Sequence, residues 1–129
     1  MDELQEYNDL VRDHFLNPRN AGLLEDASEI GVETNPVCGD SMRLMVKVEG
    51  DQIVEARFQT VGCPAAIATS SIATEMIKGR PIAEVERLTR EDFASALGGL
   101  PRNKLHCSVL AADALRAALE DYRARRVKS

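Results

Sequence analysis

The pattern that most limits the fold is a pair of alternating segments separated by a tight turn. Apolar side chains alternate with charged ones over residues 42–48, and residues 54–59 repeat this period of two. Such alternation is typical of strands that have one buried face and one polar face. Gly50 and Asp51 provide a turn between the two segments, which predicts an antiparallel hairpin. Met45 is an exception, because it falls on the polar face of the first strand.

A further strand and several helices are expected around this hairpin. Residues 27–35 predict a strand before it, and the helical spacing of apolar residues in 2–16 predicts a first helix. Strands followed by helices indicate an α+β fold, with a three-stranded antiparallel sheet packed against several helices. We expect residues 1–129 to form a single domain, since this length is usual for one domain. Apolar spacing and helix breakers predict the later helices at 65–78, 82–87, 89–97 and 107–125.

Charge and hydropathy exclude several classes of function. The 16 basic and 21 acidic residues give a net charge of −5, which argues against a general nucleic-acid-binding protein. No segment approaches the roughly 20 apolar residues that cross a bilayer, so we expect no membrane association. The acidic start of the chain does not resemble a secretory signal, and we therefore expect a cytoplasmic protein.

The three cysteines lie at junctions between predicted elements. Cys38 is in the loop before a strand, Cys63 lies between a strand and a helix, and Cys107 is at the start of the last helix. An odd number of cysteines in a reducing compartment argues against a disulfide framework. Such junctions can gather at one end of a two-layer domain, and we expect the cysteine loops there. At a helix start, as for Cys63 and Cys107, the helix dipole favours the thiolate that binds metals.

Two of the cysteines have a further metal-binding side chain beside them. Asp40 follows Cys38 after a glycine, and His106 directly precedes Cys107. Thiolates with an imidazole suit zinc or the iron of an iron–sulfur cluster, and a carboxylate is a harder, weaker partner for that iron. An interchangeable ligand of this kind indicates a carrier rather than a structural metal site. Taken alone, these residues are equally typical of buried cysteines, a turn aspartate and a helix-cap histidine.

Four segments together resemble the IscU/NifU N-terminal type of iron–sulfur cluster assembly scaffold. They occur in the order that is typical of this family and span nearly the whole chain, so the likeness is more specific than one short motif. The segments are HFLNPRN at 14–20, NPVCGD at 35–40, FQTVGCPAAIATSS at 58–71 and LHCSVLA at 105–111.

The resemblance implies a scaffold or carrier rather than an enzyme. A [2Fe–2S] cluster would be built on the protein and then transferred to recipient apo-proteins. Cys38, Cys63 and Cys107 would ligate the cluster, with Asp40 or His106 in the fourth place. Between these two, the preferred ligand is Asp40, with His106 close by. The family also carries zinc on the same ligands when it is free of cluster.

The resemblance also implies a source of sulfur and a set of partners. A pyridoxal-phosphate cysteine desulfurase would deliver sulfur as a persulfide, for which Cys107 is the preferred acceptor, and Lys104 matches a basic position of the family. Further partners would be iron, a ferredoxin or other electron donor, and a second copy of the chain in a cluster-linked homodimer.

Two details place the chain within the family. The His-Cys pair at 106–107 favours the IscU/NifU kind over the zinc-dependent SufU kind. The segment LPRNK at 100–104 differs from the Leu-Pro-Pro-Val-Lys segment that a dedicated Hsp70-type chaperone recognises. The resemblance therefore does not extend to chaperone-assisted release.

Two other functions use the same residues. A zinc-structured binding module would hold its metal on the same thiolates, carboxylate and imidazole. A thiol enzyme would use His106 to activate Cys107 or another cysteine. Adjacent residues at a helix start usually diverge in direction, which argues against the second alternative.

Overall fold

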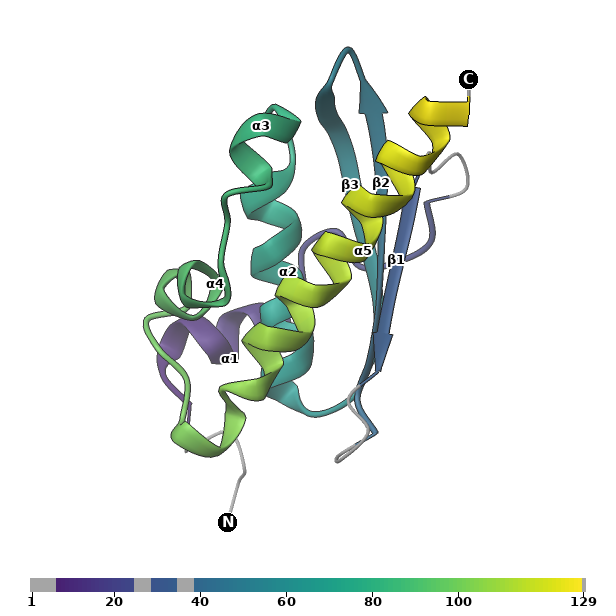
Figure 1. Ribbon diagram of the computed structural model, residues 1–129. Helices are drawn as coiled ribbons and strands as arrows, with labels where there is room; N and C mark the ends of the chain where they lie inside the picture. Colours follow the sequence, from purple (N-terminus) through teal and green to yellow (C-terminus); the bar gives the residue numbers. More distant parts are fainter. Residues whose placement is uncertain (1–6, 25–28, 35–38, 129) are drawn as a thin grey trace.

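The structure is a computed structural model that describes residues 7–24, 29–34 and 39–128. Two layers are visible in Figure 1, a sheet and a set of helices that covers one of its faces. In chain order the elements are α1 (Asp9–Leu16), β1 (Glu29–Thr34), β2 (Ser41–Glu49), β3 (Gln52–Val61), α2 (Pro64–Ile77), α3 (Ile82–Val85), α4 (Arg90–Ala96), the short 3₁₀ helix η2 (Arg102–Lys104) and α5 (His106–Lys128).

The predicted hairpin is formed by β2 and β3. Their antiparallel register places Leu44 opposite Phe58, and a bulge interrupts the ladder between Lys47 and Val48. The turn residues Gly50 and Asp51 have φ values of 58° and 62°. Two consecutive positive φ angles are the geometry that matches a tight turn to the twist of the flanking strands.

The strands of the expected three-stranded sheet are unequal in length and pairing. Among the described residues, the main ladder is the hairpin of β2 and β3, and β1 adds a shorter edge strand of six residues that pairs with β2. The strand pattern in the sequence indicates extended segments, but it does not show how many partners each segment has. The α+β class is confirmed, while the expected strand ends at 27, 28 and 35 lie outside the described residues.

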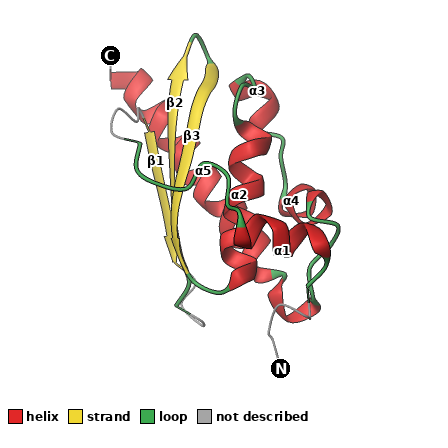
Figure 2. Ribbon diagram, turned by 180° about the vertical axis from the view of Figure 1, so that it is seen from behind, coloured by secondary structure: helices red, strands yellow, loops and turns green. Residues whose placement is uncertain are grey.

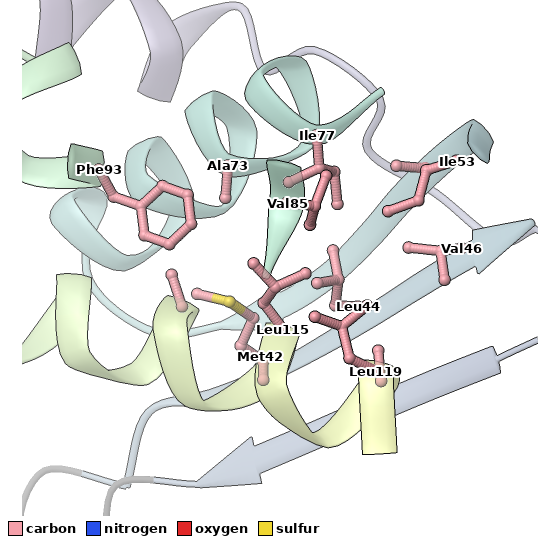
Figure 3. Close-up of a cluster of buried hydrophobic side chains, with 14 of the residues drawn as sticks. Met42, Leu44, Val46, Ile53, Ala73, Ile77, Val85, Phe93, Leu115 and Leu119 are labelled. Carbon is pink, nitrogen blue, oxygen red and sulfur yellow. The ribbon is translucent and has the colours of Figure 1, made fainter. Parts of the chain in front are cut away.

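The main core lies between the sheet and two long helices. Helix α5 contacts β1 and β2, and α2 contacts β3. Figure 3 shows side chains from both layers meeting in this core, among them Met42 and Leu44 from β2, Ala73 from α2 and Leu115 from α5. Each of these side chains is at most 3% exposed, and burying an apolar side chain of leucine or methionine size stabilises a fold by about 1.5–3 kcal/mol.

Met45, the apolar exception in β2, lies on the face of the sheet that the helices do not cover, and its burial needs another explanation. Met45 is only 1% exposed, although its neighbours in the polar set are charged. The connection from α1 to β1 crosses this face (Figure 2). It is attached to the sheet at Phe58, whose N–H donates to the carbonyl of Asn20 and whose carbonyl accepts from the N–H of Gly22. An apolar side chain beneath this connection is therefore shielded from water.

Helix ends differ from the predicted ends where caps decide them. Helix α1 starts at Asp9, because the Asn8 side chain accepts from the N–H of Val11 and caps the helix; the expected helical residues 2–6 lie outside the described residues. The amide of Asn8 also donates to the carbonyls of Leu97 and Gly99, at 2.9 and 3.1 Å. This cap therefore joins the start of α1 to the loop that follows α4.

Helix α5 is longer than predicted and is held at its far end by polar contacts. It starts at His106 and ends at Lys128, one residue earlier and three residues later than expected. Tyr122 donates to Asp51 in the hairpin turn, and Arg123 pairs with Glu86. Among the helices of the described residues, none is long and apolar enough to cross a membrane.

A buried polar seam joins α1 to α2. The hydroxyl oxygen of Ser71 accepts from the N–H of Arg19 at 2.9 Å and lies 2.8 Å from Nδ1 of His14. His14 is 7% exposed. Burial lowers the pKa of His14 below its ordinary value of 6.5, and the nearby charge of Arg19 acts in the same direction. His14 therefore has a structural role in its neutral form.

This burial predicts a pH-dependent stability. Because the pKa of His14 is lower in the folded protein than in the unfolded chain, the unfolded chain binds more protons below pH 6.5. The free energy of unfolding should then fall as the pH drops below this value, and the loss should be smaller in His14→Gln. Urea unfolding of both proteins at about pH 7.5 and about pH 5.5 measures the difference. Equal losses in the two proteins would show that His14 does not contribute.

Candidate metal centre

Three chain junctions meet at the end of the molecule opposite the hairpin turn. Asp40 precedes β2, Cys63 is the N-cap residue of α2, and His106 and Cys107 are the first residues of α5. Figure 1 shows the connection from β3 to α2 and the start of α5 at this same end. Cys38 lies outside the described residues, so its place relative to the others is not part of this geometry.

Four of the predicted site residues lie within reach of one another. The sulfur of Cys63 is 3.6 Å from Oδ2 of Asp40 and 3.8 Å from the sulfur of Cys107. The ligand atoms of Asp40, His106 and Cys107 all lie within 4.8 Å of one another. Gly39 has a φ of 78°, which is the freedom expected of the glycine that turns this loop toward the site.

The site is closed on one side and open on the other. Cys107 is fully buried in a small apolar cluster that also contains Val11, Ala66 and Leu97, and Cys63 packs against the edge of this cluster. Asp40 is 8% exposed, whereas Cys63, His106 and Lys104 are half-buried. A ligand can therefore reach Cys63 and His106 from solvent, while Cys107 forms the floor of the site.

The two thiols have opposite pKa shifts. A hydrogen bond from Cys107 lowers the pKa of Cys63 from its ordinary value of 9.0 to about 6, helped by the N–H of Ala66 and the charge of Lys104 and opposed by burial and Asp40. The bond to Cys63 and burial together raise the pKa of Cys107. The prediction that both helix starts favour a thiolate is therefore right for Cys63 and wrong for Cys107. Two sulfurs this close do not both ionise readily, and the more exposed one ionises first.

His106 and Cys107 both contribute to this group of donors, since their ligand atoms lie within 4.8 Å of each other and of Asp40. This spacing suits two ligands of one ion, whereas activation of a thiol by a histidine needs a hydrogen bond between the two side chains.

The donor set fits a thiophilic metal ion. Bonds of about 2.0–2.3 Å from a tetrahedral ion to nitrogen, oxygen and sulfur ligands require donor atoms roughly 3–4 Å apart. The distances at this site are close to that spacing, so small side-chain movements bring the donors onto one ion. Sulfur with imidazole is typical of zinc and of iron–sulfur iron, and the carboxylate is the hardest of the donors.

One residue of this site was missed by the sequence analysis. Gly62 was not among the predicted site residues, but it lies directly against the side chain of Asp40. No pattern within the segment 58–63 points to a contact with a loop more than 20 residues earlier.

Fold and site together define a small α+β protein with a half-open candidate metal centre of thiols, a carboxylate and an imidazole. The sequence of residues 6–129 matches the NifU-like N-terminal domain. The chain belongs to this family, and the resemblance to the IscU/NifU N-terminal type is confirmed.

Named relatives agree with this membership, and a solved structure has the same fold. The chain is 59% identical to the iron-sulfur cluster assembly scaffold protein IscU 1 of Archaeoglobus fulgidus over 116 residues, which are 90% of this chain and 76% of that protein. It is 52% identical to IscU of Aquifex aeolicus over 119 residues, 91% of this chain and 76% of that one. A crystal structure of a SufU scaffold protein from Fervidobacterium islandicum has the same fold, with a TM-score of 0.73 at 23% identity, and the match covers 92% of this chain and 99% of that one.

The pKa difference between the thiols gives a prediction for the metal-free protein. Cys63 should react with iodoacetamide with a midpoint near pH 6, because its thiolate is stabilised by Cys107. Cys107→Ala removes the donor and should move this midpoint upward, whereas Cys107→Ser keeps an O–H donor and should move it less. Mass spectrometry of the peptide that contains Cys63 follows its alkylation separately. An unchanged midpoint in Cys107→Ala would exclude Cys107 as the cause.

Proposed function

We propose that this protein is a scaffold on which a [2Fe–2S] cluster is assembled and from which the cluster passes to recipient apo-proteins. The observation that carries the proposal is the convergence of Cys63, Cys107, Asp40 and His106 at one half-open end. Relatives at 59% and 52% identity are named as iron–sulfur cluster assembly scaffolds. A scaffold holds its cargo and passes it on, so we expect no catalytic turnover.

The cluster would be held by three thiolates and one weaker ligand. We assign the thiolates to Cys38, Cys63 and Cys107, and the fourth place to Asp40 with His106 close by. A carboxylate binds iron of a cluster more weakly than a thiolate does, so this position exchanges ligands more easily. The proposed site therefore combines firm holding on three sides with a point of release at Asp40.

Sulfur would arrive from a pyridoxal-phosphate cysteine desulfurase as a persulfide. The thiolate of Cys107 attacks the outer sulfur of the donor persulfide, the donor's S–S bond breaks, and the donor cysteine leaves as a thiolate. Because Cys107 is buried beneath Cys63, this transfer requires the mouth of the site to open. Contact with Cys63 and burial raise the pKa of Cys107, so its thiolate would form only once the opening separates the two sulfurs, and the charge of Lys104 would then favour the anion.

The remaining partners follow from the chemistry of assembly. Persulfide sulfur must be reduced before it becomes the sulfide of a cluster, so a ferredoxin or another electron donor is required. The thiols must stay reduced, which suits the cytoplasm. A second copy of the chain would shield the open side in a cluster-linked homodimer. In the cluster-free protein, zinc would occupy the same donors, as their chemistry allows.

Cysteine replacement tests the assignment of the ligands. Anaerobic incubation with iron and sulfide should give a coloured protein with roughly two irons and two sulfides per cluster. Cys38→Ala, Cys63→Ala and Cys107→Ala should each greatly reduce the cluster yield, measured by visible absorbance and iron analysis. The variant His106→Ala is measured in the same way. Its matched control is His14→Gln, because the chain has two histidines and His14 lies outside the site. A full cluster yield in any cysteine variant would contradict the assignment of that cysteine, and zinc binding without any cluster formation would favour the zinc-structured module.

Replacement of the carboxylate tests the point of release. Asp40→Ala should make the reconstituted cluster clearly more persistent, since the oxygen ligand at which exchange is proposed to occur is gone. The measurement is the decay of cluster absorbance in the presence of an iron chelator. A cluster that decays as fast as in the unaltered protein would show that release does not proceed at Asp40.

A further inference from the structure

Gly62, the residue that follows β3, lies so close to Asp40 that a side chain on residue 62 would overlap with it. A Cβ atom placed on Gly62 would lie 2.7 Å from Cγ of Asp40, 2.8 Å from its Oδ1 and 3.1 Å from its Cβ. These distances are well below ordinary van der Waals contact between heavy atoms. The backbone of Gly62 is not in the left-handed region that several other glycines of this chain adopt. The need for a glycine at this position therefore comes from Asp40 and not from the local turn.

We propose that Gly62 is the positioning residue that seats the carboxylate of Asp40 in the metal centre. Gly62 is followed directly by Cys63, whose sulfur lies 3.6 Å from the other carboxylate oxygen, Oδ2. The Asp40 side chain is thus held between the backbone of Gly62 on one side and the sulfur of Cys63 on the other. Its low exposure of 8% reflects this close packing. The consequence for cluster release rests on the proposed function, whereas the seating itself does not.

A methyl group at Gly62 should move the carboxylate without unfolding the protein. The two nearest atoms, Cγ and Oδ1, belong to the end of the Asp40 side chain and not to backbone, so rotation of that side chain relieves the overlap with them. The contact of 3.1 Å with Cβ of Asp40 needs a shift of only a few tenths of an ångström. Gly62 is exposed, and its backbone conformation is open to alanine. Gly62→Ala should therefore displace Asp40 from the donor group and reproduce the effect of removing Asp40.

Zinc binding to the apo-protein gives a readout that does not depend on cluster assembly. We expect Gly62→Ala to weaken zinc binding by about tenfold, a typical result when the orientation of a ligand is lost. Asp40→Ala should weaken it by a similar factor. Competition with a chromophoric chelator measures both, and thermal unfolding checks that each variant is folded.

A pair of variants isolates the contact between the two residues. Asp40→Gly leaves no side chain for the added methyl group to meet, so Asp40→Gly and Asp40→Gly/Gly62→Ala should bind zinc equally. The cluster of Gly62→Ala should persist as long as that of Asp40→Ala. If Gly62→Ala does not fold, Asp40→Gly in the same chain should restore folding, because it removes the overlap.

Several results would overturn the proposal. The proposal fails if Gly62→Ala binds zinc as tightly as the unaltered protein while Asp40→Ala binds zinc weakly. That result would show that Asp40 keeps its place beside a methyl group. An additional loss on adding Gly62→Ala to Asp40→Gly, or no recovery of folding by Asp40→Gly, would place the role of Gly62 elsewhere. If Asp40→Ala changes zinc binding but not cluster persistence, the release step of the proposed function fails and the seating by Gly62 stands.

Discussion

The close packing of α2 against α5 is the constraint on which the rest of the site depends. Both helices present buried alanines toward the core, including Ala66 in α2 and Ala111 and Ala114 in α5. Small side chains allow helices to approach closely. With the helices in contact, Cys63 at the start of one lies 3.8 Å from Cys107 at the start of the other. Two thiols that are 44 residues apart in sequence thus become a single chemical unit.

This proximity also divides the work between the two sulfurs. Cys107 lies at the floor of the site within an apolar cluster, keeps its proton and donates a hydrogen bond. Cys63 lies at the edge, and its lowered pKa makes it largely anionic at neutral pH. An incoming cation therefore meets a thiolate first. Its arrival favours loss of the proton from Cys107, because a bound metal stabilises the anionic form of a thiol.

The sequence was most informative where local chemistry decides the structure. Alternation over 42–48 and the Gly50-Asp51 turn predicted the hairpin, and apolar spacing predicted the helix at 89–97, which the structure has as α4 with a capping box at its start. It was less informative where distant segments decide. The burial of Met45 depends on a connection that crosses the outer face of the sheet. The place of β1 at the edge of the sheet depends on its pairing with β2, which the sequence of β1 does not show.

The same division applies to the metal centre. The residue types and their junction positions predicted which side chains could gather, and the structure brings Asp40, Cys63, His106 and Cys107 together. The charge state of each thiol could not be predicted, because the pKa of Cys107 depends on a sulfur contributed by another helix. The contact of Gly62 with Asp40 could not be predicted either, since a glycine at a strand end has many local explanations.

The two sides of the site differ in how easily they can move. On the α5 side, Cys107 is enclosed by apolar side chains from α1, α2 and the segment that follows α4, so displacement of this sulfur would disturb a packed cluster. On the opposite side, Asp40 follows a glycine with positive φ and rests on the exposed Gly62. The carboxylate of Asp40 is nearly buried, but it is seated by a glycine backbone and one sulfur and not by a packed apolar cluster. In the proposed scaffold, exchange of a bound ligand therefore costs less at Asp40 than at Cys107.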